Sequence, residues 1–196
     1  MRWCARTRGP RLDRRAIVRP FSPADANTVN AVALAAFAQY RGVYSDWETL
    51  ARGVGSMSSL AGQAELIIAE EAGAVVGAVA YCPPRSQPRA EFFAPEWPIV
   101  RMLVVRPRAR GRGIGRMLAA ECVKRAKRDG AALIALHTSP AMEVALAMYL
   151  RMGFTLLRRV PDRFGVPYAV YTMPVGAEGG GRQGSPDAAA PARRER

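Results

Sequence analysis

The chain has 196 residues, 49% of them hydrophobic, and a formal net charge of +13 at pH 7. This length and composition suit one globular domain with tails, and they exclude a membrane-spanning protein because no apolar run could cross a bilayer. The basic N-terminal segment lacks the apolar stretch of a secretory signal, so we expect a cytoplasmic protein with reduced thiols. Cys4, Cys82 and Cys122 are widely spaced and His137 is the single histidine, so we expect no metal site.

The positive charge raises the question of nucleic acid as a partner. All basic residues except Lys124 and Lys127 are arginines, which a GC-rich coding sequence produces whatever the function. Much of the charge also lies in the first 19 and the last 15 residues, outside the predicted fold. We therefore expect no nucleic-acid ligand.

The first part of the chain predicts a strand followed by two helices. Residues 1–15 carry six arginines and few large hydrophobic residues, so we expect a disordered basic arm there. A short strand follows at 16–20. A helix then extends from Ser22, its N-cap, to about Tyr40, and a second helix is expected over 46–54.

Two strands and a long loop come next. Residues 65–82 predict a hairpin, and residues 83–98 predict a proline-rich loop. We interpret Phe92, Phe93 and Trp97 in that loop as a hydrophobic cover. The alternative is that they touch substrate in a cleft.

The last part alternates helices and strands. A helix ends at Gly130, and a second one, opened by Ser139 and Pro140, ends at Gly153. Strands are expected over 132–137, 155–160 and 168–173, with a disordered tail over 175–196. The first of these helices carries apolar residues at every fourth position, namely Ile114, Leu118, Cys122 and Ala126.

The central stretch runs from Ile99 to Arg116 and reads IVRMLVVRPRARGRGIGR. It predicts a buried strand over 99–105, then a loop with three glycines, then a helix. The first turn of a helix leaves backbone N–H groups unpaired, and glycines let a phosphate approach them closely. Four arginines add positive charge, at 108, 110, 112 and 116. The sequence therefore predicts a polyphosphate-binding loop.

The spacing decides between the known phosphate-binding motifs. No Lys-Ser or Lys-Thr pair follows the glycines, which excludes a Walker A loop, and Arg116 stands where the dinucleotide fingerprint GxGxxG needs its last glycine. Residues 110–115, RGRGIG, instead fit [Q/R]xxGx[G/A] and resemble the acyl-CoA-binding motif of the GNAT superfamily of N-acetyltransferases. The alternative interpretation is an ordinary loop rich in arginine and glycine.

The resemblance extends over residues 16–174. The predicted order of strands and helices looks like the GNAT fold, an α/β fold whose mixed, mostly antiparallel sheet is splayed around a cofactor cleft and flanked by about four helices. Residues 142–154, MEVALAMYLRMGF, are similar to the second signature of the family.

The resemblance implies a reaction and a set of site residues. The co-substrate would be acetyl-CoA, without a metal, and the acetyl group would pass directly to a primary amine of a small molecule or peptide. Tyr149 matches the tyrosine that protonates the departing sulfur; the alternative is a tyrosine that only packs on a helix face. The residues placed at acetyl-CoA are Leu103, Val104, Val105, Arg110, Gly111, Arg112, Gly113, Ile114, Gly115 and Arg116.

Two positions depart from the family pattern. Met142 replaces an asparagine of the second signature, and Ile99 stands where many relatives carry an acidic residue. A general base is therefore unassigned. Glu91 and Glu96 lie nearby in sequence, and the alternative is that they are exposed loop carboxylates. His137 is expected at a strand end beside the cleft, and the alternative is a buried or capping histidine. The competing hypothesis is a non-catalytic module that binds CoA and holds a partner through its basic arms. The acceptor amine, the acyl preference and dimerisation are left open.

Overall fold

Strands and helices alternate along residues 15–176, the part of the chain that the computed structural model describes. The strands are β1 (Ile17–Pro20), β2 (Glu65–Glu71), β3 (Ala74–Cys82), β4 (Ile99–Val105), β5 (Leu133–Thr138), β6 (Thr155–Arg163) and β7 (Val166–Pro174). The α-helices are α1 (Ala26–Phe37), α2 (Trp47–Val54), α3 (Ile114–Arg128) and α4 (Glu143–Arg151). The predicted basic arm and nearly all of the predicted tail lie outside the described residues.

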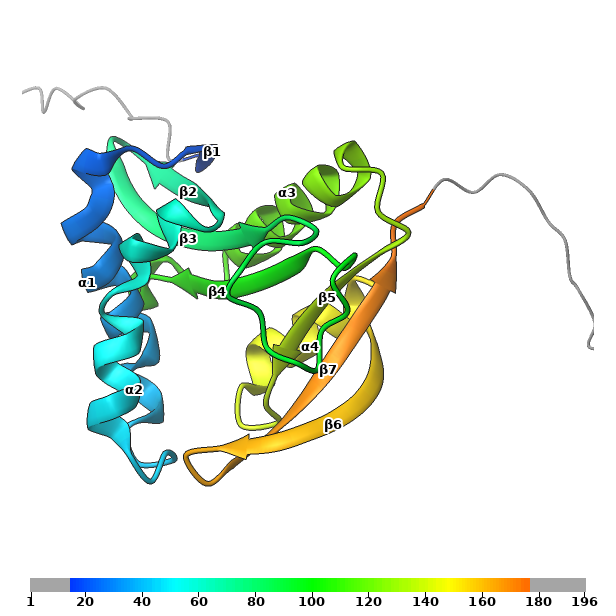
Figure 1. Ribbon diagram of the computed structural model, residues 1–196. Coiled ribbons are helices and arrows are strands. Elements are labelled where there is room, and N and C mark those ends of the chain that lie inside the picture. The colour runs from blue at the N-terminus through cyan, green and yellow to red at the C-terminus, as the bar shows by residue number, and fades with distance from the viewer. Residues whose placement is uncertain (1–14, 177–196) are drawn as a thin grey trace, which may run out of the picture.

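The strands form one sheet in the order β1-β2-β3-β4-β5-β7-β6 (Figure 1). Neighbouring strands are antiparallel except β4 and β5, which are parallel. These two central strands pair only at Ile99 with Ala135 and at Val100 with Leu136. Beyond these residues they part, which confirms the predicted mixed sheet with a central splay.

Different helices cover the two faces of the sheet (Figure 1). On one face, α3 and α4 bury Leu118 and Tyr149 against the strands. On the other face, α1 and α2 bury Val29 and Leu50. Neighbouring residues of β4 therefore belong to different cores, and Val104 packs with the α1 side.

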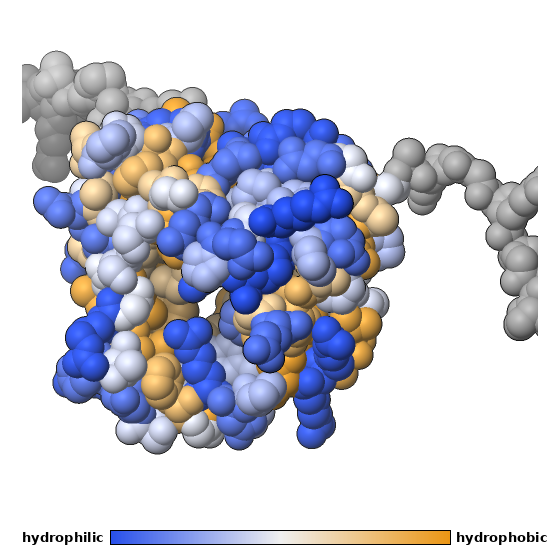
Figure 2. Space-filling model, in the orientation of Figure 1, coloured by the Kyte–Doolittle hydropathy of each residue, from blue (hydrophilic) through white to orange (hydrophobic). Residues whose placement is uncertain are grey.

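The loop between β3 and β4 covers a third cluster on the α1 side of the sheet. It buries Phe93 against Ile99, Ala135 and Val170. This supports the interpretation of the loop aromatics as a hydrophobic cover, and the alternative of substrate contact stays open. The face drawn in Figure 2 is hollowed near its middle, and hydrophilic side chains lie along much of the rim.

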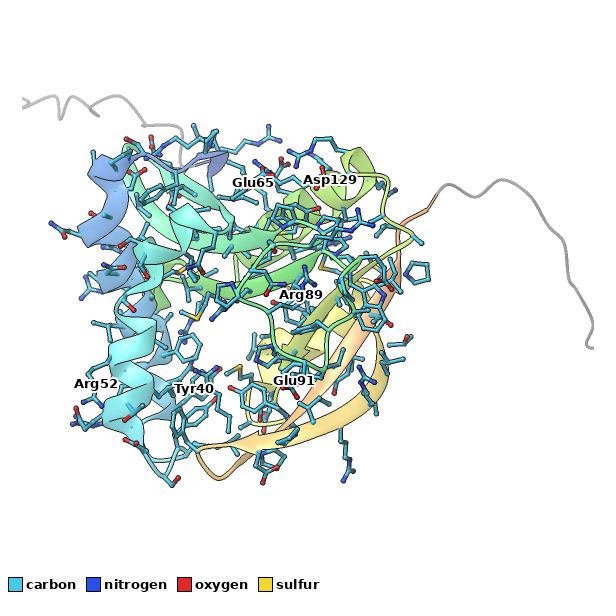
Figure 3. All side chains as sticks on the ribbon, in the orientation of Figure 1. Tyr40, Arg52, Glu65, Arg89, Glu91 and Asp129 are labelled. Atoms are coloured by element: carbon cyan, nitrogen blue, oxygen red, sulfur yellow. The ribbon has the colours of Figure 1, made fainter. Side chains whose placement is uncertain are left out.

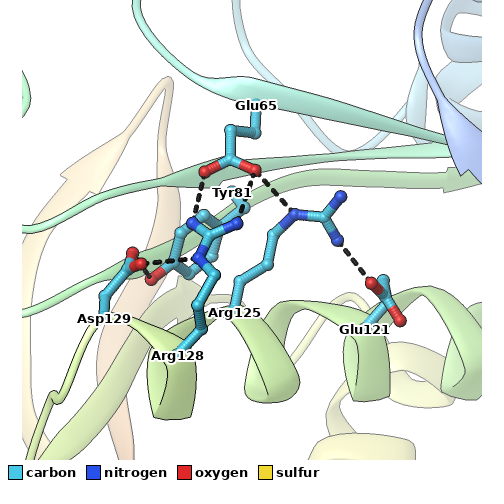
Figure 4. A network of polar contacts seen from close by, with 6 residues as sticks. All are labelled: Glu65, Tyr81, Glu121, Arg125, Arg128 and Asp129. Carbon is cyan, nitrogen blue, oxygen red and sulfur yellow. Dashed lines mark hydrogen bonds and ion pairs between the residues drawn. The ribbon is translucent and has the colours of Figure 1, made fainter.

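An ion-pair network attaches the C-terminal half of α3 to the β2-β3 hairpin (Figure 4). Glu65 of β2 accepts from Arg125 Nε at 2.8 Å and from Arg128 Nη2 at 2.6 Å. The Tyr81 hydroxyl donates to Asp129 Oδ2 at 2.7 Å. These contacts fix the direction of α3 against the sheet and therefore the place of its N-terminus.

The sequence located most elements correctly. The hairpin of β2 and β3 turns at Ala72 and Gly73, which have φ angles of 48° and 76°. The predicted start of the last helix was wrong, because α4 begins at Glu143. Ser139 Oγ accepts from the Ala141 N–H at 3.1 Å and so forms a turn before the helix instead of capping it. Within residues 15–176 no helix has the length and hydropathy that crossing a membrane needs.

Candidate active site

A bulge interrupts β4 where it leaves its regular pairing with β3. Ala78 pairs with Val104 and Ala80 pairs with Arg101, so two residues of β4 lie opposite one residue of β3. Met102, inside the bulge, has a φ of 55°, which is rare for a side-chain-bearing residue. Such strain persists where a fold needs a local backbone geometry, and it often marks a functional site. Nothing in the sequence predicted this bulge, because Met102 is neither glycine nor asparagine.

The splay leaves part of the β4 backbone without a neighbouring strand. The Arg106 N–H donates to the Val76 carbonyl at 2.8 Å, so Arg106 and Val104 face β3. Leu103 and Val105 alternate with them and face the side where β5 has moved away. Leu103 and Val105 are thus the residues whose backbone faces the opening, and their contact with acetyl-CoA stays a prediction. Val104 instead directs its backbone to β3 and its side chain into a core.

The glycine loop presents open backbone at the start of α3. Gly111 and Gly113 have φ angles of 73° and 79°, and a Cβ on either would meet no atom within 4 Å. Among the described residues, no acceptor bonds the N–H groups of Gly113, Ile114 or Gly115, and no side chain caps the helix. An exposed helix N-terminus with these free donors suits a phosphate group.

The arginines around this loop do not all face it. Arg110 reaches across to the end of α1, where it donates to the Ala36 carbonyl at 2.8 Å and to Gln39 Oε1 at 2.9 Å. Arg112 forms an ion pair with Glu71. These contacts hold the loop to its neighbours, and Arg112 also lines a pocket together with Gly113 and Ile114. The binding of a phosphate by Arg110 and Arg112 stays a prediction. Arg116 is exposed and forms no ion pair with a described residue.

Tyr149 lies near the end of α4, with 5% of its surface exposed. Its ring packs edge-on against Phe154. Its hydroxyl has no hydrogen-bond partner among residues 15–176, although it is not completely shut off from solvent. Burial raises the pKa of this phenol, so the hydroxyl keeps its proton at neutral pH.

A second site lies on the opposite face of the sheet, at the start of the splay. It is a pocket of about 460 Å³ under the β3-β4 loop. Arg101 and His137, which line it, directly follow the last paired residues of β4 and β5. Phe92, Phe93 and Tyr168 form an aromatic wall around the imidazole, with ring centroids 5.3–5.8 Å from that of His137.

The imidazole in this pocket is neutral at physiological pH. Burial, together with the charges of Arg163 and Arg101, lowers the pKa of His137 to about 4. The sequence allowed two interpretations of His137, a buried structural residue or a residue that lines the cleft. The structure places it in the wall of the pocket. Within the described residues, no three Asp, Glu, His or Cys side chains come together to hold a metal ion.

The profile of the acetyltransferase (GNAT) family matches residues 32–154 of this chain. The chain belongs to the GNAT acetyltransferase family. The match covers the second half of α1, the splayed strands, the glycine loop and the helix with Tyr149. No curated protein matches the sequence of this GNAT protein.

Solved structures of GNAT proteins share this fold. A GNAT-family protein from Desulfovibrio desulfuricans has 22% identity over 83% of this chain and 100% of its own, with a TM-score of 0.61. PaiA N-acetyltransferase from Thermoplasma acidophilum, in complex with coenzyme A, has 19% identity over 82% of this chain and 99% of its own, with a TM-score of 0.64. YncA from Salmonella typhimurium, with its cofactor acetyl-CoA, has 17% identity over 89% of this chain and 99% of its own, with a TM-score of 0.60.

Among the described residues of this GNAT protein, no aspartate or glutamate lines the second pocket. Glu91 and Glu96 are both exposed in the β3-β4 loop and neither lines the pocket. Figure 3 shows Arg89 and Glu91 on this loop, near the middle of the face drawn. The general base that the sequence could not assign is therefore not supplied by either glutamate in this arrangement.

The asparagine position of the second signature has a different local role here. Met142 is the N-cap residue of α4, and its side chain makes no cap hydrogen bond. Its sulfur accepts from the Thr138 hydroxyl at 3.6 Å, which is a weak contact. Met142 therefore packs at the end of β5 and offers no amide to a ligand.

Proposed function

We propose that this protein transfers the acetyl group of acetyl-CoA to a primary amine by direct attack. The observation that carries the proposal is the splay of β4 and β5, which lies beside the open N-terminus of α3 and has the second pocket at its start on the opposite face. The family of this chain supports acetyl transfer in general. Coenzyme A and acetyl-CoA in two proteins of the same fold support the choice of acyl donor.

The residues present fit acetyl-CoA. The N–H groups of Gly113, Ile114 and Gly115 would bind its pyrophosphate, because they lack another acceptor among the described residues. The backbone of Leu103 and Val105 would bind the pantetheine amides as an additional strand does. When bound, acetyl-CoA supplies an activated thioester.

The chemistry needs one bond made, one broken and two proton transfers. The amine nitrogen forms a bond to the thioester carbonyl carbon, and the carbon–sulfur bond breaks. The proton of the amine passes to water, and Tyr149 gives its proton to the departing thiolate and then regains one from water. Because burial keeps the phenol protonated, Tyr149 is in the correct state to act as an acid.

The positive charge of the second pocket reduces the need for a general base. An amine attacks only in its neutral form, and neighbouring positive charge lowers the pKa of an ammonium group. Arg89, Arg101 and Arg163 line this pocket. They favour the neutral amine, so water is a sufficient proton acceptor.

The test is turnover of the full chain with acetyl-CoA and a panel of primary amines. We expect CoA thiol release that depends on the amine, together with an equal amount of acetylated product detected by mass. Thiol release without any amine is the control for simple hydrolysis. If acetyl-CoA binds but no amine in the panel accelerates thiol release, the non-catalytic CoA-binding module is favoured instead.

A further inference from the structure

The second pocket lies where an acceptor would meet the thioester, if the proposed function holds. Pairing between β4 and β5 ends at Val100 and Leu136. The next residue of each strand, Arg101 and His137, lines the pocket. A molecule in the pocket therefore reaches the opening between the strands from the side opposite α3 and α4.

The pocket carries positive charge that no carboxylate balances. Arg89, Arg101 and Arg163 line it, and no aspartate or glutamate of the described residues does. None of these three arginines forms an ion pair within residues 15–176. Arg89 and Arg101 are partly buried, whereas Arg163 is exposed. A partly buried guanidinium group without a counter-ion is unfavourable, and an anionic ligand would remove that penalty.

The three arginines of the pocket make different contacts. Arg89 donates to the Ala94, Trp97 and Pro83 carbonyls at 3.0, 2.6 and 3.1 Å, so it holds the β3-β4 loop together. Its Nε is buried and has no hydrogen-bond partner. The side chain of Arg101 makes no hydrogen bond to another described residue, and the side chain of Arg163 only lies over the ring of Phe164. Arg101 and Arg163 are thus the side chains available to a ligand.

The other residues that line the pocket suit a ligand with a small apolar group. Phe92, Phe93, Tyr168 and the neutral His137 supply flat, mostly apolar surface. A volume of about 460 Å³ is in the usual range for small-molecule sites.

We propose that the acceptor is a small amine that also carries a carboxylate and an apolar side chain, as hydrophobic amino acids do. Arg101 and Arg163 bind the carboxylate, the aromatic wall holds the side chain, and the amine faces the splay. This inference names the substrate class of the proposed transferase and rests on that function.

The experiment compares amines that differ only in the carboxylate. Phenylalanine is paired with 2-phenylethylamine, and leucine with 3-methylbutylamine, each with saturating acetyl-CoA. A charge-assisted hydrogen bond contributes about 1.5–3 kcal/mol, so we expect kcat/KM to be about 10- to 100-fold higher for the amino acid in at least one pair. Equal values in both pairs, or no reaction of either amino acid while other amines react, would overturn the proposal.

A single substitution tests whether Arg101 binds the carboxylate of the acceptor. Arg101→Gln should raise KM for the preferred amino acid about 10- to 100-fold and leave KM for acetyl-CoA unchanged. The matched control is Arg159→Gln, because Arg159 is exposed on β6 and does not line the pocket. An equal effect of Arg101→Gln on the amino acid and on its decarboxylated partner would contradict carboxylate binding.

A binding measurement separates this inference from the proposed function. Calorimetry with N-acetylphenylalanine and N-acetyl-2-phenylethylamine needs no turnover. Tighter binding of the carboxylate, lost in Arg101→Gln, supports the pocket even if no amine is acetylated. Binding of neither compound overturns the pocket assignment. The aminophosphonate analogue of phenylalanine is a further arm, and a preference for it would assign the pocket to phosphate-bearing amines instead.

Discussion

The backbone N–H of Phe154 donates to the carbonyl oxygen of Tyr149 at 3.1 Å, and the two rings meet edge-on with centroids 5.5 Å apart. The Gly153 N–H donates to the Leu150 carbonyl at 3.0 Å, and Gly153 has a φ of 99°. Together these bonds form the Schellman arrangement that ends a helix with glycine. The end of α4 is therefore fixed by the same residues that hold the Tyr149 ring in place.

Tyr149→Phe tests the role of the phenol as an acid. The hydroxyl has no hydrogen-bond partner within residues 15–176. Its removal should therefore change the free energy of unfolding by no more than about 1 kcal/mol. We expect kcat to fall by roughly 10²–10⁴ and KM for acetyl-CoA to stay nearly unchanged. Steady-state kinetics give the result. Unchanged turnover would show that Tyr149 only packs in the core. A rise in KM alone would show that it binds acetyl-CoA and does not act as an acid.

Two substitutions at Gly113, at the start of α3, distinguish the effect of an added charge from that of an added side chain. Its φ of 79° suits glycine, but asparagine and aspartate adopt this region more readily than other residues. Gly113→Asp adds a negative charge beside the predicted pyrophosphate, whereas Gly113→Asn adds a side chain of the same shape without charge. We expect thermal stabilisation by acetyl-CoA to be lost in the aspartate variant and weakened less in the asparagine variant. Equal stabilisation of Gly113→Asp and the unaltered protein would exclude this loop as the phosphate site.

His137 should make the fold sensitive to mild acid. The unfolded chain takes up a proton at a pKa of about 6.5, whereas the folded pKa is about 4, so the unfolded state binds more protons between these values. Stability should therefore fall as pH drops from 6.5 to 4, by up to about 3 kcal/mol. Melting temperatures over this range should depend less on pH in His137→Phe, which keeps an aromatic ring beside Phe92 and Phe93. The same slope in both proteins would contradict a neutral buried imidazole.

The network on α3 should respond at lower pH. Hydrogen bonds from Arg128 and Arg125 lower the pKa of Glu65, so its contribution is present above the unfolded pKa near 4.3 and is lost as pH falls below it. Glu65→Gln should lower stability at pH 7 by roughly 1 kcal/mol and flatten the loss below pH 4. Glu48→Gln is the control, because its ion pair with Arg41 is largely exposed and spans 3.6 Å. An equal change in the two variants would show that the network adds nothing beyond an exposed charge.

Local patterns in the sequence located the scaffold of this site. The four apolar residues at i, i+4 spacing in α3, from Ile114 to Ala126, are all buried as predicted. Gly153 ends α4 because a glycine there permits the left-handed conformation. The glycines at 111 and 113 do adopt positive φ at the start of α3.

Long-range contacts explain what the sequence did not reveal. Arg110 and Arg112 were expected around the glycine loop, but their partners Ala36 and Glu71 are remote in sequence. The bulge at Met102 depends on pairing with β3 and leaves no residue signature. The positive pocket likewise combines arginines from a loop, β4 and β6, and only the folded sheet brings them together.

Amide hydrogen exchange with and without acetyl-CoA tests the central claim most directly. The claim is that the co-substrate occupies the splay, bonded to β4 and to the first turn of α3. We predict slower exchange at Leu103 and Val105 and at residues 113–116 when acetyl-CoA is added, with little change at the edge strands β1 and β6. Binding without protection at either segment would contradict the claim.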